Sequence, residues 1–161
     1  MGQRLTLLQI DDNPDDRFFF KQAISLTSTP FEYYEADSME SAATYFQLHP
    51  QRPRPDLVIL DYRLGLHTGL DFLYWLRVLK KETSILIAIL SGVPGGQNAE
   101  EFYAAGANYF LSKPVSFERL KTVIRTLYGG IISKRRPGQL ALLKEYQPSH
   151  ELYGADGQPK N

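Results

Sequence analysis

The chain has 161 residues, of which 43% are hydrophobic and 22% charged, as in an ordinary globular domain. Basic and acidic side chains number 18 each, so the formal net charge is zero, and neither direct nucleic-acid binding nor membrane binding is expected. There is no cysteine, no signal peptide and no apolar run near the roughly 20 residues of a membrane span, so we expect a cytoplasmic protein without disulfides or thiolate sites.

Predicted strands and helices alternate along the chain. Strands are predicted at 5–10, 31–36, 57–60, 85–90 and 108–111; helices are predicted at 39–49, 69–81, 98–106 and 116–130, with another that begins at Pro14 and includes Ile24. The strands at 5–10, 57–60 and 85–90 are almost continuously apolar, which is typical of parallel strands covered on both faces. The pattern therefore predicts an α/β fold with a doubly wound parallel sheet of five strands and helices on both faces.

Several residues predict where the helices begin and end. Pro14 suits the first turn of the first helix, and Ser38 suits the N-cap of the second. Phe19 and Phe20 recur with later apolar residues at helical spacing, which places both on the core side of the first helix. Leu79 continues the apolar side of the third helix, and Gly129 is the predicted end of the fifth.

The periodic pattern stops near Ile131. We therefore predict one domain over residues 1–130 and a C-terminal extension over residues 131–161. The extension contains one candidate short helix at Gln139–Tyr146 and a polar end rich in Gly and Pro, which is typical of a short helix or a partly disordered tail.

Charged and polar residues stand at the carboxyl ends of the predicted strands. Asp11 and Asp12 follow the first strand, Asp61 the third, Ser91 the fourth and Lys113 the fifth. In doubly wound sheets the ligand site lies beyond these strand ends. Carboxylates held close together repel one another, and a divalent cation that prefers oxygen ligands, Mg²⁺, relieves this repulsion. An aspartate beside such a metal can accept a phosphoryl group, whose charge a lysine and a hydroxyl stabilise.

These residues, in this order and spacing, resemble the receiver domain of two-component response regulators. The likeness runs from about Arg4 to Tyr128 and rests on Asp11-Asp12, Asp61, Ser91 and Lys113-Pro114. The resemblance implies a flavodoxin-like sheet of order 2-1-3-4-5. It also implies that Asp61 is the phosphoacceptor.

The resemblance implies further roles, residue by residue. Asp12, Asp61 and the backbone carbonyl of Arg63 would bind Mg²⁺, with Asp11 acting through water. Ser91 and Lys113 would stabilise the phosphoryl group. Ser91 and Phe110 match the switch pair of the family, Gly69 matches the glycine that begins its third helix, and the bond before Pro114 is expected to be cis.

The chain departs from the family pattern at two positions. Gly65 stands where many relatives have proline, which predicts a looser loop after Asp61, and Phe110 has no hydroxyl to donate in the switched state. Asp15 and Asp16 are interpreted as acids in the first turn of a helix, where the helix dipole favours them, and not as ligands.

The favoured hypothesis is a stand-alone phosphorelay receiver, not an enzyme by purpose. A sensor histidine kinase or phosphotransfer protein would donate the phosphoryl group, and output would pass through a partner or a homodimer. One alternative is an Mg²⁺-dependent aspartyl-nucleophile phosphatase, but its usual second aspartate is replaced here by Arg63. Another is a binding module that keeps the receiver shape and works without phosphorylation.

Overall fold

The computed structural model of the chain describes residues 4–48, 51–92 and 98–135. Strands and helices alternate along these residues as predicted. In chain order the elements are β1 (Leu5–Ile10), α1 (Pro14–Thr27), β2 (Phe31–Ala36), α2 (Met39–Gln47), β3 (Leu57–Asp61), β4 (Arg63–Leu64), β5 (His67–Thr68), α3 (Gly69–Tyr74), a π-helical turn (Trp75–Leu79), β6 (Leu86–Ser91), α4 (Ala99–Ala104), β7 (Tyr109–Ser112) and α5 (Phe117–Arg135).

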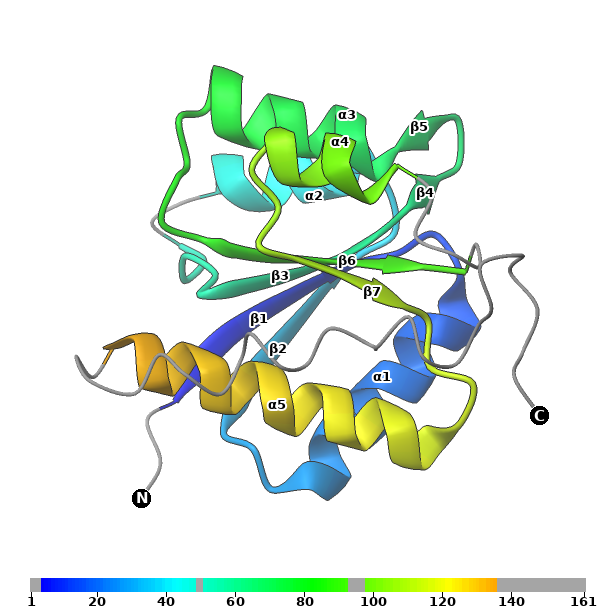
Figure 1. The fold of residues 1–161 in the computed structure, drawn as a ribbon. Coiled ribbons are helices and arrows are strands. Elements are labelled where there is room, and N and C mark those ends of the chain that lie inside the picture. Colours follow the sequence, from blue (N-terminus) through cyan, green and yellow to red (C-terminus); the bar gives the residue numbers. More distant parts are fainter. Residues whose placement is uncertain (1–3, 49–50, 93–97, 136–161) are drawn as a thin grey trace.

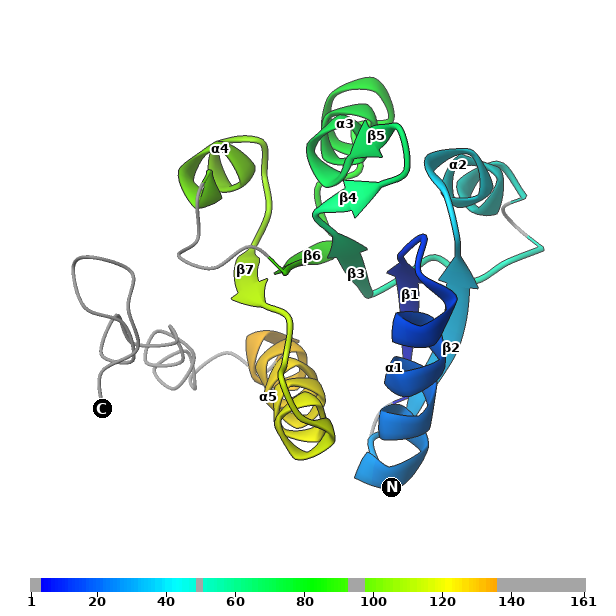
Figure 2. The same ribbon diagram turned by 90° about the vertical axis from the view of Figure 1, so that its right-hand side faces the viewer.

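Five of these strands form one parallel sheet of order β2-β1-β3-β6-β7 (Figure 1). Since β6 and β7 are the fourth and fifth predicted strands, the predicted order 2-1-3-4-5 is confirmed. Figure 2 shows α1 and α5 on one face of the sheet and α2, α3 and α4 on the other. The short strands β4 and β5 form a separate antiparallel pair just after β3, which was not predicted.

The sheet is buried on both faces because successive side chains of each strand point to opposite sides. In β3, Leu57 and Ile59 pack with the apolar residues of α1 and α5, whereas Val58 and Leu60 pack with those of α2, α3 and α4. Burial of one such side chain contributes about 1.5–3 kcal/mol. The continuous apolar run therefore follows from a central strand that has no solvent face.

The starts of α1 and α2 are capped; the predicted positions of Pro14 and Ser38 are confirmed, whereas the cap at Asn13 was not predicted. The Asn13 side chain accepts a hydrogen bond from the Asp15 backbone, and Pro14 occupies the first turn of α1. Ser38 and Ser41 form a reciprocal capping box at the start of α2. A cap at Asn13 makes α1 begin immediately after the acid pair that follows β1.

Two residues predicted to be buried are exposed. Phe19 is 53% exposed, because the buried side of α1 is a narrow stripe through Phe20, Ala23 and Ile24. Leu79 is 62% exposed and lies at the end of the π-helical turn. A π-turn holds an extra residue, so the apolar spacing expected of an α-helix no longer keeps residues beyond it on the core side.

Arg77, in this π-helical turn, connects three separate segments. Its guanidinium donates hydrogen bonds to the backbone carbonyls of Glu82, Ile85 and Gly106 and to the Asn108 side chain. These acceptors lie before β6 and in the turn between α4 and β7. Arg77 thus fixes the end of the third helical segment against the segments that lead into β6 and β7, the strands that end next to Lys113.

The predicted end of the fifth helix at Gly129 is wrong. Helix α5 continues through both glycines to Arg135, and the predicted boundary at residue 130 falls inside it. Ile131 is 3% exposed and belongs to the core between the sheet, α1 and α5. Its burial offsets the low helix propensity of glycine. The candidate helix at Gln139–Tyr146 lies outside the described residues.

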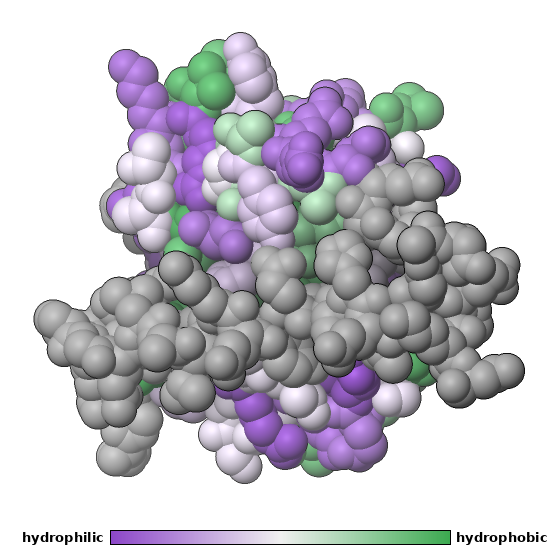
Figure 3. Space-filling model, viewed as in Figure 1, coloured by the Kyte–Doolittle hydropathy of each residue, from purple (hydrophilic) through white to green (hydrophobic). Residues whose placement is uncertain are grey.

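The visible surface is mixed in polarity. Where described residues appear on the face drawn in Figure 3, small groups of hydrophobic residues are interspersed with hydrophilic ones. Within the described ranges, no helix has both the length and the apolar character needed to cross a membrane.

Candidate functional site

Three carboxylates meet at the carboxyl ends of β1 and β3. Oxygen atoms of Asp11, Asp12 and Asp61 all lie within 4.8 Å of one another. Asp11 and Asp61 are buried, because each continues a buried strand, whereas Asp12 is exposed. Three clustered carboxylate oxygens with one side open to solvent can hold a hard metal ion.

Lys113 brings a positive charge to this cluster from the end of β7. Its Nζ lies 3.2 Å from Asp61 Oδ1, 3.3 Å from Asp11 Oδ2 and 2.6 Å from Asp16 Oδ2. The backbone N–H of Lys113 donates to the Ser91 carbonyl at 2.7 Å, so the ends of β6 and β7 are joined next to the lysine. The predicted group of acids and lysine is therefore assembled in one place.

The contact between Lys113 and Asp16 was missed by sequence reasoning, which assigned Asp16 only to the first turn of α1. The spacing of residues along the helix could have predicted this contact. Asp16 precedes Phe20 by four residues and Ala23 by seven, so it lies on the buried side of α1. Asp15 has no such relation and is exposed.

Burial and charge shift the pKa values of the two buried acids upward. Burial raises the pKa of Asp11 to about 6; the Asn13 backbone N–H opposes this shift and the charge of Asp61 adds to it. Burial also raises the pKa of Asp61, against the opposing effect of Lys113. The site thus disfavours its own negative charge and is suited to bind a cation.

The pKa of Lys113 is shifted upward by its neighbours. Burial alone would lower it, but the hydrogen bond to Asp16 and the charges of Asp11 and Asp61 outweigh burial. The lysine therefore stays an ammonium throughout the physiological pH range, and can stabilise an anion without a change in protonation.

The loop after Asp61 is held by a hydrogen bond to the acid cluster. The Gly65 backbone N–H donates to Asp12 Oδ2 at 3.0 Å, with Gly65 at φ +63°, which proline cannot adopt. Arg63 and Leu64 pair with His67 and Thr68 in the β4–β5 hairpin. A proline could not make this bond and glycine can, so glycine provides a contact to the acid cluster at this position; that the loop is looser than in relatives with proline stays a prediction.

Gly69 places the start of α3 directly against the backbone of Asp61. A Cβ atom at Gly69 would lie 2.5 Å from the Asp61 carbonyl oxygen, closer than any real contact. The Gly69 N–H also donates to the Tyr62 carbonyl at 2.8 Å. A side chain at this position would displace either α3 or the candidate phosphoacceptor.

Aromatic rings connect the end of β3 with α4 and β7. Tyr62, next to Asp61, lies 5.4 Å from the Phe102 ring of α4, and Phe102 lies 5.4 Å from Phe110 of β7. Ser91 is almost fully buried at the end of β6. The role of Ser91 and Phe110 as a switch pair stays a prediction.

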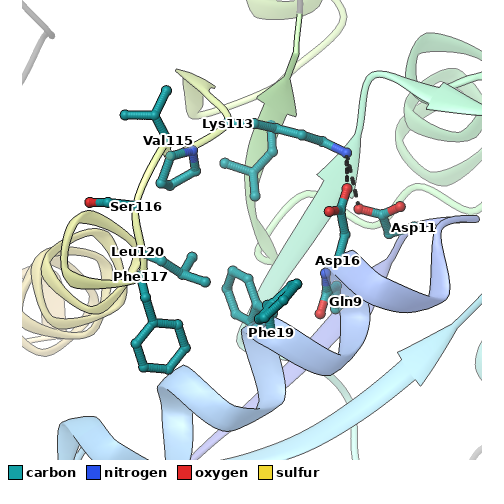
Figure 4. A pocket seen from close by; sticks show the side chains of 12 residues that line it. Gln9, Asp11, Asp16, Phe19, Lys113, Val115, Ser116, Phe117 and Leu120 are labelled. Atoms are coloured by element: carbon teal, nitrogen blue, oxygen red, sulfur yellow. Dashed lines mark hydrogen bonds and ion pairs between the residues drawn. The ribbon is translucent and has the colours of Figure 1, made fainter.

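Pro114 lines a cavity of about 300 Å³ beside Lys113 (Figure 4). The cavity lies between α1 and α5, with apolar walls that include Phe19, Phe117 and Leu120, and Asp16 at its polar rim. The cis bond at Pro114 and the metal-binding carbonyl of Arg63 stay predictions.

Comparisons with known proteins agree with this geometry. The family model of the response regulator receiver domain matches residues 7–125. The response regulator Rre1 of Synechocystis is 30% identical over 99% of this chain and 68% of its own length. The heme response regulator HssR of Staphylococcus saprophyticus is 24% identical over 88% of this chain; the match covers 61% of HssR.

Solved structures share the fold. The phosphorylated cyanobacterial phytochrome response regulator RcpA matches with a TM-score of 0.71 and 18% identity, over 82% of this chain and 96% of its own. The Mn²⁺-bound response regulator Rcp1 matches with a TM-score of 0.66 and 17% identity, over 74% and 91%. The family match, the sheet order and the converging acids and lysine lead to one conclusion: the chain belongs to the response regulator receiver domain family.

Proposed function

We propose that this protein is a phosphoacceptor of a two-component or phosphorelay system, in which Asp61 receives a phosphoryl group. The observation that carries the proposal is the environment of Asp61. Its carboxylate ends a buried strand, belongs to a cluster of three acids and lies 3.2 Å from the Lys113 ammonium. A nucleophile, a cation site and a charge-stabilising donor are together what phosphoryl transfer requires.

The donor is a phosphohistidine of a sensor histidine kinase or of a phosphotransfer protein. An Asp61 oxygen attacks phosphorus, and an O–P bond forms while the P–N bond to histidine breaks. The histidine nitrogen keeps the bonding pair and takes up a proton. Lys113 neutralises charge on the phosphoryl oxygens, and the Ser91 hydroxyl donates a hydrogen bond to one of them.

Asp11, Asp12, Asp61 and the carbonyl of Arg63 would hold Mg²⁺. Bound there, Mg²⁺ would shield the acids and the incoming phosphoryl oxygens from mutual repulsion. Two observations support this assignment: the donor atoms are all oxygens, and the raised pKa values of Asp11 and Asp61 reflect a cost of burying negative charge that a cation reduces. The relative Rcp1 is described as Mn²⁺-bound, which agrees with a hard divalent cation in this fold.

Phosphorylation would act as a switch. The added charge draws Ser91 inward, Phe110 follows, and the surface formed by α4, β7 and α5 changes its preferred conformation. A bias of about 1–3 kcal/mol is enough for regulation. Output passes to a protein partner or to a second copy of the chain, and we place the purpose of the site in signalling and not in catalysis.

The two alternatives are less well supported. An aspartyl-nucleophile phosphatase needs a general acid two residues after Asp61, where this chain has the exposed side chain of Arg63. A receiver-shaped module that works without phosphorylation would not need the three acids and the lysine in contact.

Intact mass spectrometry tests the proposal. Wild type, Asp61→Asn and the surface control Asp15→Asn are incubated with acetyl phosphate, with Mg²⁺ or with a chelator. We expect one base-labile phosphoryl adduct on wild type and on Asp15→Asn, only with Mg²⁺, and none on Asp61→Asn. If neither acetyl phosphate nor a panel of phosphorylated histidine kinases labels the wild type, the module that works without phosphorylation is the better description.

A further inference from the structure

We infer that Asp16 is a positioning residue, which holds the Lys113 ammonium in the resting state and has to release it when Asp61 carries a phosphoryl group. This inference rests on the proposed function, because it concerns how readily the phosphorylated state forms. Asp16 has no place among the metal-binding and phosphoryl-binding residues named so far.

The contact distances carry the inference. Of the three carboxylates that surround the Lys113 ammonium, Asp16 is the nearest at 2.6 Å, compared with 3.2 Å for Asp61 and 3.3 Å for Asp11. Figure 4 shows the lysine reaching across the rim of the cavity to Asp16 on α1 and Asp11. At 2.6 Å the Asp16 bond is a short charge-assisted hydrogen bond, and the other two are long ones.

Asp16 is fixed in this position by its helix. It lies in the first turn of α1, whose start is set by the Asn13 cap and Pro14, and the helix dipole favours its negative charge there. Its side chain is 37% exposed, whereas those of Asp11 and Asp61 are 3% and 9% exposed. The desolvation cost of a charged carboxylate is therefore smaller at Asp16 than at the two buried acids, so Asp16 competes effectively for the ammonium.

A phosphoryl group at Asp61 changes this competition. It adds close to two negative charges and three acceptor oxygens at the acid that now makes one of the long contacts. The ammonium has three hydrogens to donate, and in the resting state three carboxylates surround it. A shift of the ammonium toward the phosphoryl oxygens lengthens its short bond to Asp16, and the loss of this bond opposes phosphorylation. Without Asp16 this opposition is absent, so the phosphorylated state should form more readily.

The test is Asp16→Asn, with Asp15→Asn as the matched control. Asp15 is the adjacent acid of the same helical turn, is exposed, and makes no side-chain ion pair among the described residues, so both variants lose one charge from the same place. The readout is binding of beryllofluoride, a phosphoryl mimic that requires Asp61, at saturating Mg²⁺ for each variant. We expect Asp16→Asn to bind about twofold to fivefold more tightly than Asp15→Asn, the range for one partly exposed ion pair.

A second pair of variants shows whether Asp16 acts through Lys113. In a Lys113→Met background, the difference between Asp16→Asn and Asp15→Asn should disappear, whereas a merely structural effect on α1 would persist. Equal or weaker binding by Asp16→Asn, or a difference that survives in the Lys113→Met background, overturns the inference. A wild type that binds no beryllofluoride and accepts no phosphoryl group overturns the proposed function as well, so the two failures are distinguishable.

Discussion

Asp11 is an acid whose position favours ligand binding at the expense of stability. It is 2% exposed, next to Asp61, and burial raises its pKa to about 6. Without a bound cation the folded protein therefore carries a buried carboxylate at neutral pH that the unfolded chain would hydrate. We expect Asp11→Asn to raise the free energy of unfolding at pH 7.5 by about 1–3 kcal/mol, because it removes this charge.

The pH dependence of this effect has a defined sign. Between the unfolded pKa of about 3.8 and the folded pKa of about 6, the folded state binds the Asp11 proton more tightly than the unfolded chain does. The Asp11 contribution to stability therefore falls as pH rises through this window and is constant above it. The gain from Asp11→Asn should be small at pH 4 and full at pH 7.5, as measured by urea unfolding with a chelator present.

Asp12→Asn is the matched control for this experiment. Asp12 belongs to the same acid cluster but is exposed, so its charge stays hydrated in the folded protein. Its replacement should therefore change the free energy of unfolding much less. Equal gains from both variants, or a gain from Asp11→Asn that does not depend on pH, would contradict the role of burial. Both variants should weaken Mg²⁺ binding, because both carboxylates are proposed ligands.

At the scale of elements, the apolar pattern of the sequence was sufficient to predict the longer strands. Strands β1 and β2 have the predicted bounds, β3 ends one residue later than predicted, and β6 begins and ends one residue later, because continuous apolar runs occur where a strand is buried on both faces. The β4–β5 hairpin has two residues in each strand, too few for any period to appear. The helical turn at Arg77 depends on acceptors from 5 to 31 residues away along the chain, which no local pattern predicts.

Two glycines in helices have opposite expected effects. At Gly129, inside α5, nothing lies within 4 Å of an added Cβ, so Gly129→Ala should stabilise the protein by about 0.5–1 kcal/mol through helix propensity. At Gly69 the added Cβ would overlap the Asp61 carbonyl, so Gly69→Ala should destabilise by about 1–3 kcal/mol and reduce phosphorylation of Asp61.

Urea unfolding of both variants, followed by circular dichroism, checks these effects. The two variants are controls for each other, because each adds the same methyl group and only the surroundings of that group differ. If Gly129 ended the helix, as the sequence suggested, and did so in a left-handed conformation, Gly129→Ala would destabilise the protein instead. If Gly69→Ala left stability unchanged, the start of α3 would not be in contact with the backbone of Asp61.

At the scale of the whole molecule, the site was predictable because topology brings its parts together. Asp11, Asp61, Ser91 and Lys113 are far apart in sequence, yet each follows or ends a parallel strand, and all such ends meet at one edge of the sheet. Asp16 was missed because it enters the site from a helix and not from a strand end. The extent of α5 was also missed, because Gly129 and Gly130 indicate the end of a helix, whereas the burial of Ile131 stabilises its continuation.

The continuation of α5 predicts where the folding unit ends. Residues 131–135 are helical, Ile131 is buried between α5, α1 and the sheet, and Ile132 packs against the same core. A chain ending at residue 130 loses both side chains and exposes the apolar residues that they cover. We expect it to be less stable than a chain ending at residue 135 by about 2–4 kcal/mol, the cost of removing one large aliphatic side chain from a core.

Chemical unfolding of the two truncated chains measures this difference directly, and Ile131→Ala in the full chain is the matched variant. It should lose a similar free energy of unfolding while the helix keeps its length, which separates the loss of packing from the loss of helical turns. Equal stabilities for the two truncations would place the end of the domain at residue 130. A large difference between the truncations without any effect of Ile131→Ala would mean that the helix end itself, and not the buried side chain, stabilises the fold.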